Sequence, residues 1–408
     1  MTNISLEQAI NLENRFGCPL YIFNEKEFVE NYKEFGRILT SYYPKYHIAY
    51  SYKTNYTPYI CNIVKELGGY AEVVSGMERF IAKKIGYEDD KIIYNGPNKG
   101  LDGIEAIQSG AIVNADNLVE LRNISDYVKK DTTGEYRIGL RVNLDIGQDF
   151  ISRFGMDIQD IEAAFQIVSS ISNLSIVGLH CHISRCRGLY AWEKRTELML
   201  ELADRFFKES PPQYIDLGSG MFGKMDPSLS AQFENIPTYM QYAMVTAKIV
   251  AEHYKGVDES SKPILFTEPG TTLINKYIDF LCCVDSIKKL RGKAFLTFNC
   301  SEHNLGETSM LKQLPIKVIK KSKEQETITN GDFVGYTCLE QDVFYKDYNG
   351  NIGVGDYVLF GNVGGYSNVY KPPFIRPNCA MIAITESGEV KTIKQSETYE
   401  DILRTYSF

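Results

Sequence analysis

A lysine at the end of an apolar segment is the first side chain in this sequence that is suited to covalent chemistry. In the segment His47-Ile-Ala-Tyr-Ser-Tyr-Lys53, every second side chain points to the same face of a strand. A surface lysine is the commoner interpretation of such a residue. If this face is buried, desolvation lowers the pKa of the Lys53 amine and frees it to form a Schiff base with a carbonyl compound.

Two histidines, His180 and His182, end a later apolar segment and also share one face. Such a pair can bind a metal, pack in a core or stack on an aromatic cofactor. The sequence offers no convincing third and fourth metal ligand beside them. We therefore expect no metal site, and we keep His182 as a candidate for contact with a cofactor ring.

Two turns supply groups that could hold a phosphorylated aromatic cofactor. Gly218-Ser219-Gly220 follows a short apolar run, and glycines let backbone N–H groups approach a phosphate. Glu268-Pro269-Gly270-Thr271 follows another run, and a carboxylate there can pair with a pyridinium nitrogen and keep the ring electron-withdrawing. Taken alone, the glycine turn is weak evidence, and Glu268 could equally be a capping or surface acid.

The elements that must position these residues alternate between strand and helix. Short apolar runs, each followed by a helical pattern, favour a parallel (β/α)₈ barrel, with a doubly wound sheet as the alternative. In a barrel, Lys53 would lie at the carboxyl ends of the strands, where active sites form. The eight runs are 47–52, 71–74, 92–94, 111–115, 136–142, 176–182, 214–217 and 264–267.

The pattern changes after about residue 275, where short strand-like runs are separated by turn signals such as Asn330-Gly331, Asn349-Gly350 and Gly355-Asp356. We predict a C-terminal all-β domain. The expected division is a barrel over residues 26–275 and a β-domain made of residues 1–25 and 276–408. Cys338 and Tyr366 fall in the β-domain, and taken alone they would be a structural thiol and a core tyrosine.

Composition limits the possible partners and compartment. The chain has 408 residues and a formal net charge of −8, which argues against nucleic acid and anionic membranes as partners. No apolar run approaches the roughly 20 residues that cross a bilayer. The nine cysteines are scattered and form no Cys-x-x-Cys pair, so we expect a cytoplasmic protein with free thiols.

Taken together, the segments resemble the fold-type III pyridoxal-5′-phosphate (PLP) decarboxylases. These are the diaminopimelate, ornithine and arginine decarboxylases, which have an alanine-racemase-like barrel. About ten motifs occur in the family's order. Besides those above, they are Gly17-Cys-Pro-Leu-Tyr21, Ala71-Glu-Val-Val-Ser-Gly-Met-Glu78, Tyr94-Asn-Gly-Pro-Asn-Lys99, Asn114-Ala-Asp116, Arg141-Val-Asn143, Arg153-Phe-Gly155 and Gly364-Gly-Tyr366.

The resemblance implies roles for the matching positions. It makes Lys53 the Schiff-base lysine and Cys338 the thiol that reprotonates the α-carbon after carbon dioxide leaves. It also implies a homodimer in which Cys338 reaches the partner's barrel. The implied cofactor contacts are His182 on the ring, Glu268 on the ring nitrogen, and Gly218, Ser219, Gly220, Pro269, Gly270, Thr271 and Tyr366 around the phosphate.

Departures from the family pattern bear on the substrate. Leu339 stands where the basic-amino-acid decarboxylases carry an acid, with Glu340 next to it, and Thr271 replaces an arginine. Arg185 replaces a serine that touches phosphate. We therefore expect Arg185, or Arg187 beside it, to bind either the cofactor phosphate or an anionic substrate, because guanidinium groups bind both in bidentate fashion. The alternative is that both arginines point to solvent.

The sequence thus predicts a PLP-dependent decarboxylase for a modified amino acid, a small-molecule substrate. The substrate would be acylated, carboxylated or tethered to a carrier protein, as in siderophore or antibiotic assembly. Three alternatives stay open: a diaminopimelate or basic amino-acid decarboxylase, an amino-acid racemase, and a non-catalytic PLP-binding regulator. Release of carbon dioxide separates the decarboxylases from the racemase.

Overall fold

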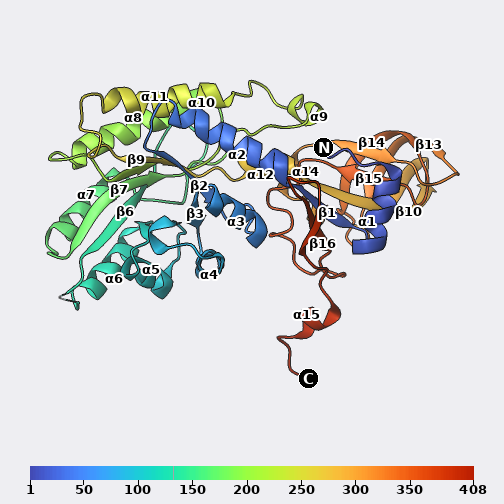
Figure 1. Cartoon of the computed structure of the whole chain (residues 1–408), viewed down its shortest axis with the longest axis horizontal. Coiled ribbons are helices and arrows are strands. Elements are labelled where there is room, and N and C mark those ends of the chain that lie inside the picture. The colour runs from blue at the N-terminus through green and yellow to red at the C-terminus, as the bar shows by residue number, and fades with distance from the viewer. Residues whose placement is uncertain (132) are drawn as a thin grey trace. The chain divides into compact units, whose positions relative to one another are not determined.

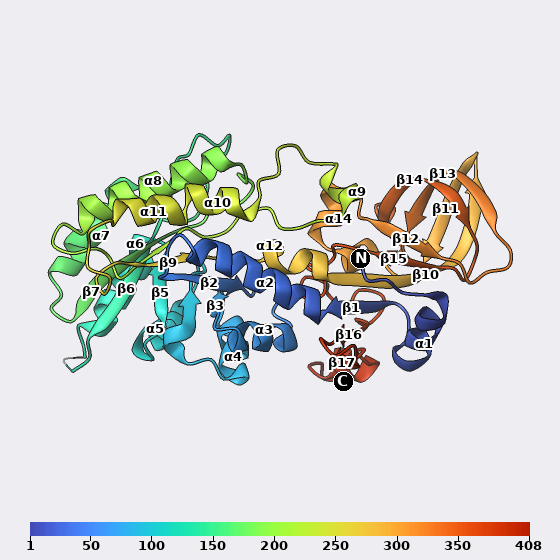
Figure 2. The same cartoon turned by 45° about the horizontal axis from the view of Figure 1, so that its top comes forward.

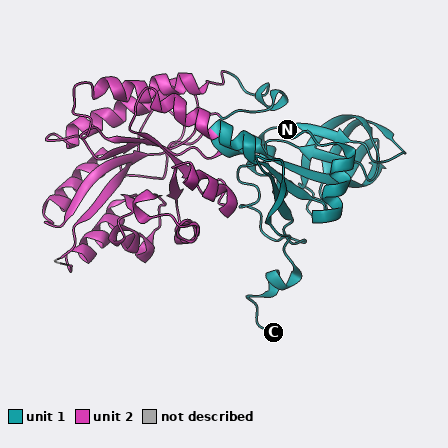
Figure 3. Ribbon diagram, viewed as in Figure 1, with its two compact units in different colours: residues 1–31, 223–234, 273–408 teal, residues 32–222, 235–272 magenta. Residues whose placement is uncertain are grey.

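The chain forms two compact units. The computed structural model describes residues 1–131 and 133–408. One unit contains residues 1–31, 223–234 and 273–408, and the other contains residues 32–222 and 235–272 (Figure 3). Unlike the expected continuous range 26–275, the barrel unit excludes residues 26–31 and 273–275 as well as the segment 223–234. This segment is held by Asp226, which pairs with the Met1 ammonium at 3.1 Å and donates its N–H to Asn362.

The barrel unit is a closed sheet of eight parallel strands in sequence order (Figure 1). Strand β9 pairs with β2 and closes the ring. The expected (β/α)₈ barrel is therefore confirmed, and the doubly wound sheet was wrong. The strands are β2 (Tyr46–Ser51), β3 (Tyr70–Val73), β4 (Ile92–Tyr94), β5 (Ile112–Ala115), β6 (Tyr136–Val142), β7 (Leu174–Cys181), β8 (Tyr214–Asp216) and β9 (Ile264–Thr267).

Helices connect successive strands and cover the outside of the barrel, and α10 and α11 pack beside α8 (Figure 2). Side-chain caps start several of them, as Ser75 does for α4 and Asp157 for α7. The helices are α2 (Glu25–Thr40), α3 (Pro58–Glu66), α4 (Gly76–Ile85), η1 (Asp89–Lys91), α5 (Gly100–Gln108), α6 (Leu118–Val128), α7 (Ile158–Ser169), α8 (Leu189–Phe206), α10 (Tyr239–Val245), α11 (Ala247–His253) and α12 (Thr271–Ile274).

The interior of the barrel is filled by side chains from the strands. Ala49, Tyr70, Ile93, Tyr214 and Phe266 form one buried cluster. Ala49 and Ser51 are buried as well, so the face of β2 that leads to Lys53 points into the barrel. Layers of side chains from alternate strands are typical of such barrels.

The second unit contains a nine-stranded sheet with the order β14-β13-β11-β10-β1-β16-β17, in which β15 pairs with β10 and β12. The predicted C-terminal sheet domain is therefore confirmed, although it is not all-β, because short helices lie between its strands and at its end. The strands are β1 (Leu20–Asn24), β10 (Ile278–Leu290), β11 (Lys293–Phe298), β12 (Ile316–Ile319), β13 (Glu326–Val334), β14 (Val343–Ile352), β15 (Tyr357–Phe360), β16 (Ala380–Ile384) and β17 (Val390–Lys394).

Two predicted turns lie inside long strands instead. Asn330-Gly331 falls within β13 and Asn349-Gly350 within β14, and the two strands pair with each other on both sides of register shifts. Asn330 adopts a φ of 56° and Asp347 a φ of 58°. Left-handed residues at bulges let a β-ladder continue past an irregularity, which is why turn-forming residues did not end these strands.

Short helices complete the sheet unit. They are α1 (Leu6–Phe16), α9 (Pro227–Ser230), η2 (Asn275–Tyr277), α13 (Glu302–Leu305), α14 (Glu307–Leu311) and α15 (Tyr399–Leu403). Among the described residues, no helix combines the length and apolar character needed to span a membrane.

Candidate active site

Lys53 lies in the turn after β2, at the carboxyl ends of the barrel strands. Its Nζ atom donates a hydrogen bond to Glu72 Oε2 at 2.7 Å, and Ser51 Oγ donates to the same oxygen at 2.7 Å. The Lys53 side chain is 27% exposed, whereas that of Glu72 is fully buried. The lysine is therefore a partly exposed amine held against a buried carboxylate, and not the surface lysine of the commoner interpretation.

Glu268 gathers three side chains around its carboxylate. His182 Nδ1 lies 3.0 Å from Oε2 and His180 Nε2 lies 3.1 Å from Oε1, the latter contact not being aligned as a hydrogen bond. Asn95 Nδ2 donates to both Glu268 Oε1 and Glu72 Oε1, so one amide links the two buried acids. The lysine and the histidines thus belong to one polar network.

Burial and charge assign different protonation states to neighbouring acids. Burial pushes the pKa of Glu268 upward, but His180, His182 and Lys53 outweigh this and hold it well below its usual value. Burial, followed by the charge of Glu268, raises the pKa of Asp216 well above its usual value. At neutral pH the site therefore holds an ionised Glu268 beside a neutral Asp216.

The two histidines are neutral at neutral pH. Burial is the largest influence on both, and it lowers the pKa of His182 to about 4 in spite of the hydrogen bond with Glu268. It lowers the pKa of His180 too. A neutral His182 imidazole has a desolvated π face, which is suited to stacking on an aromatic ring.

The cluster His180, His182 and Glu268 also has to be weighed as a metal site. One ligand atom from each residue lies within 4.8 Å of the others. The fold thus supplies a third ligand that the sequence pattern did not reveal. However, both oxygens of Glu268 already have protein partners, Asn95 and His180 on one and His182 on the other.

The Gly218–Gly220 turn packs tightly on the segment after β7. Gly218 has a φ of 68°, and a Cβ there would lie 2.2 Å from Cys181 O. Gly220 has a φ of 110°, and its Cβ would lie 2.8 Å from Ile183 O. Only glycine suits both positions, so the backbone forms a shallow cradle of the kind that receives phosphate.

The turn after Glu268 also packs closely, here against the segment that follows Lys53. A Cβ on Gly270 would lie 2.0 Å from Thr54 Oγ1, in the segment that follows Lys53. Thr271 is the first residue of α12. The Glu268-Pro269-Gly270-Thr271 turn and the Lys53 turn are therefore neighbours, as the sequence predicted for a shared site.

Arg185 and Arg187 follow His182 in an irregular loop. Arg185 is exposed and has a φ of 72°, at the centre of a tight turn in which Cys186 N–H donates to Ser184 O at 2.9 Å. A left-handed non-glycine residue in such a turn is strained, and strain of this kind gathers at functional sites. The Arg187 guanidinium lies 5.3 Å from the centre of the Phe222 ring, so this arginine is not simply solvated.

Three candidate residues, Cys338, Glu340 and Tyr366, belong to the sheet unit. Cys338 and Glu340 are exposed, in the loop between β13 and β14. Tyr366 is partly buried and has a φ of 53°, after Gly365, whose N–H donates to Asn275 Oδ1 at 3.0 Å. The exposed thiol differs from the buried structural cysteine that its sequence position alone would indicate.

No functional role was assigned from the sequence to four residues of this site, which are Glu72, Asn95, Asp216 and Arg195. Each is fully or nearly fully buried. The available signal was a polar residue placed in an otherwise apolar strand or on the apolar stripe of a helix, which is rare without a partner.

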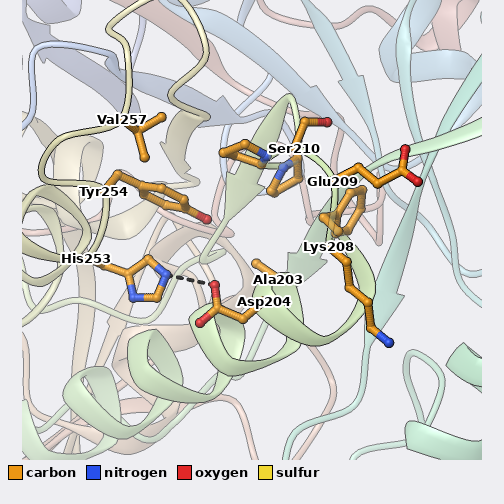
Figure 4. Close-up of a pocket in the computed structure, with 11 residues that line it drawn as sticks. Ala203, Asp204, Lys208, Glu209, Ser210, His253, Tyr254 and Val257 are labelled. Atoms are coloured by element: carbon orange, nitrogen blue, oxygen red, sulfur yellow. Dashed lines mark hydrogen bonds and ion pairs between the residues drawn. The ribbon is translucent and has the colours of Figure 1, made fainter.

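A separate hollow of about 240 Å³ lies at the opposite, amino ends of β8 and β9 (Figure 4). His253 Nε2 lies 3.0 Å from Asp204 Oδ1 there, and the pair is drawn with a dashed line in Figure 4. Both side chains are solvent-accessible, at 27% and 63%. Active sites of such barrels form at the carboxyl ends of the strands, so this hollow lies away from the candidate site.

Comparison with known protein families identifies both parts of the chain. Residues 26–275 match the family described as "Pyridoxal-dependent decarboxylase, pyridoxal binding domain". Residues 198–364 match "Pyridoxal-dependent decarboxylase, C-terminal sheet domain".

Individual relatives agree over nearly the whole length. The chain is 26% identical to diaminopimelate decarboxylase of Aquifex aeolicus, covering 96% of this chain and 92% of that protein. It is 25% identical to that of Methanothermobacter thermautotrophicus, covering 97% and 93%. Diaminopimelate decarboxylase from M. jannaschii, solved with L-lysine, superposes with a TM-score of 0.83 at 24% identity, covering 98% and 94%. Lysine decarboxylase from Selenomonas ruminantium superposes with a TM-score of 0.75 at 17% identity, covering 95% and 97%.

Glu78 is a buried acid in the barrel unit whose titration we expect to make the protein's stability depend on pH. It lies in the first turn of α4 and accepts a hydrogen bond from Val74 N–H at 2.7 Å, and burial raises its pKa to about 7. Because the folded state holds the proton more tightly than the unfolded state, folding is favoured below pH 4.5 and loses stability as the pH rises to 7. We expect the free energy of unfolding to fall by about 3 kcal/mol over that window from this group.

Urea unfolding of the apoprotein between pH 4.5 and 8 measures this loss. Glu78→Gln should lose about 3 kcal/mol less stability than wild type over this window, whereas Glu105→Gln, which alters an exposed acid on α5, is the matched control that should follow wild type. Parallel curves for wild type and Glu78→Gln would show that Glu78 does not titrate in this range.

Proposed function

The chain belongs to the pyridoxal-dependent decarboxylase family, and from this premise we propose that it decarboxylates an α-amino acid with a second acidic group at its distal end, diaminopimelate being the first candidate. The activity of the family is PLP-dependent removal of an amino-acid carboxylate, so the racemase and the non-catalytic alternatives are not retained. The curated relatives above are named diaminopimelate decarboxylases and support this substrate.

One observation carries the proposal: the Lys53–Glu72 pair and the His182–Glu268 pair lie in one buried network, linked by Asn95. These residues fit PLP. Lys53 Nζ would bind its carbonyl carbon covalently, His182 would lie against the ring, and the Glu268 carboxylate would face the ring nitrogen. Gly218-Ser219-Gly220 and Pro269-Gly270-Thr271 would receive the phosphate, with Tyr366 as a further proposed contact from the sheet unit.

The cofactor, when bound, withdraws the electrons that the departing carbon dioxide leaves on the α-carbon. The protein controls charge and protons around it. Because Glu268 stays ionised among buried groups, it stabilises a proton on an aromatic nitrogen opposite it. Glu72 contacts Lys53 Nζ at 2.7 Å and can therefore accept or return the amine proton.

Replacement of the lost carboxylate by a proton needs an acid, and we assign this step to Cys338. Its thiol is exposed, in a loop that Asp342 holds by accepting hydrogen bonds from the Thr337 N–H and Oγ1. The resemblance to dimeric decarboxylases supports delivery of this thiol to the barrel of a second copy. We therefore propose a homodimer with shared active sites.

The strained Arg185 favours the distal acidic group of the proposed substrate. An exposed guanidinium three residues after His182 is placed to bind a carboxylate at the mouth of the site. Leu339, beside Cys338, offers no charge for a distal ammonium, which L-lysine, L-ornithine and diaminopimelate all carry. These two residues also support the second candidate, an acylated, carboxylated or carrier-tethered amino acid, in which Arg187 and Glu340 would be further substrate contacts.

Lys53→Ala should abolish both cofactor attachment and catalysis. Wild-type protein with PLP should absorb at about 420 nm, and the variant should lose that band together with carbon dioxide release. Lys83→Ala, on the exposed face of α4, is the control and should keep both. Retention of the band in Lys53→Ala would place the attachment at another lysine.

The substrate proposal is tested by labelled carbon dioxide release from a panel of amino acids. We expect turnover of meso-diaminopimelate to exceed that of L-lysine and L-ornithine by roughly 5-fold, because only the diacid has a distal carboxylate for Arg185 and an exposed ion pair contributes up to about 1 kcal/mol. Arg185→Ser should raise KM for the diacid more than it lowers kcat. If N-acylated or carrier-bound amino acids react and diaminopimelate does not, the second candidate replaces the first.

Shared active sites are tested by mixing two inactive variants. Lys53→Ala and Cys338→Ala homodimers should each be inactive, and a refolded equimolar mixture should regain roughly a quarter of the wild-type rate through hybrid dimers. Reconstitution from Lys53→Ala and Glu72→Gln, whose altered residues lie in the same unit, is the control that should stay inactive. No recovery in the first mixture would place each site within a single chain.

A further inference from the structure

Arg195 is a fully buried arginine in the barrel unit. It lies on α8 at a position where the helix's apolar stripe, with Trp192, Met199 and Leu200, faces inward. Among the described residues it forms no ion pair with a carboxylate. Its guanidinium instead stacks over the Trp192 ring, with Cζ 4.0 Å from the ring centre. A buried charge without an acidic partner is costly and calls for a specific reason.

The guanidinium is held by backbone carbonyls from two loops. Nη1 donates to Leu217 O and Ser219 O, each at 2.9 Å, and Nη2 donates to Ile183 O at 2.9 Å. These carbonyls belong to the Gly218–Gly220 turn and to the segment after His182. Burial lowers the pKa of Arg195, but an arginine stays protonated in proteins. One cation therefore fastens together the two loops that form the cradle.

These hydrogen bonds determine where the neighbouring N–H groups point. In a planar trans peptide, the carbonyl of one residue and the N–H of the next point in opposite directions. The Ile183 and Ser219 carbonyls face Arg195, so the N–H groups of Ser184 and Gly220 face away from it. The N–H of Gly218 is already bonded to Asp216 Oδ1 at 2.9 Å. Within the described residues, no protein acceptor contacts the other two N–H groups.

Successive N–H groups that converge on one side of a loop form an anion-binding concavity. The Ser184 and Gly220 N–H groups come from the two loops that Arg195 fastens, and its positive charge lies on the carbonyl side of both peptides. We propose that Arg195 is the positioning residue for the cofactor phosphate. It orients the Ser184 and Gly220 N–H groups toward the phosphate and contributes charge through the backbone without touching the ligand. The inference concerns the cofactor and does not depend on the proposed substrate.

The test compares cofactors with and without the phosphate. Apoprotein carrying Arg195→Met, which keeps most of the side-chain length but not the charge, is titrated with PLP and with pyridoxal by absorbance. We expect PLP affinity to fall roughly 30- to 100-fold and pyridoxal affinity to change less than about 3-fold, because only PLP uses the cradle. Arg195→Lys, which retains the charge, should lose less PLP affinity than Arg195→Met.

Matched controls separate positioning from general packing. Arg205→Met alters an exposed arginine of the same helix, paired with Glu162, and should leave both affinities unchanged. Inorganic phosphate should raise the melting temperature of wild-type and Arg205→Met apoprotein, but not that of Arg195→Met. An equal loss of PLP and pyridoxal affinity would show a merely structural role and overturn the proposal, as would no loss at all. Should Arg195→Met not fold, the PLP-to-pyridoxal affinity ratio of Arg195→Lys decides in the same way.

Discussion

Closure of the barrel is the constraint on which the site depends. Strand β9 pairs with β2 in the register Tyr46↔Leu265 and Ile48↔Thr267. That pairing brings the first and last strands of the ring side by side, so the turn after β2 meets the turn after β9. Lys53 and the Glu268 turn are more than 200 residues apart in the sequence, and closure makes them neighbours. A one-residue slip would turn the inward side chains outward and separate them.

Within this ring, the buried carboxylates determine the electrostatics. Glu268 remains charged because two imidazoles, an amide and a lysine surround it, while Asp216 nearby is kept neutral by the same burial and by that charge. The Asn95 amide connects Glu268 to Glu72 and, through Glu72, to Lys53. A change to one member alters the charge that the others experience, since little solvent is present to screen it. At the proposed phosphate cradle the balance is different, because backbone carbonyls rather than acids surround the buried Arg195 cation.

Much of the fold could be predicted from local pattern. The strand-like runs of the barrel coincide with β2–β9 to within a few residues, because buried parallel strands are short, apolar and separated by amphipathic helices. Prediction failed where backbone geometry overrode residue preference. Asn330-Gly331 and Asn349-Gly350 are strong turn formers. They nevertheless lie within β13 and β14, which stay paired across register shifts.

The sequence by itself determined the chemical inventory: a lysine at the end of an inward-facing strand, a later histidine, a glycine turn and a Glu-Pro-Gly turn, in an order that matches one family. The order of such motifs is a property of the chain and needs no coordinates. Only the tertiary structure decided which groups act together. Glu72 contacts Lys53, Asn95 joins two acids and Arg195 fastens two loops, because contacts across barrel strands depend on register and closure. Protonation followed from the same source, since burial and neighbouring charge, and not residue type, make Glu268 an anion and Asp216 a neutral acid.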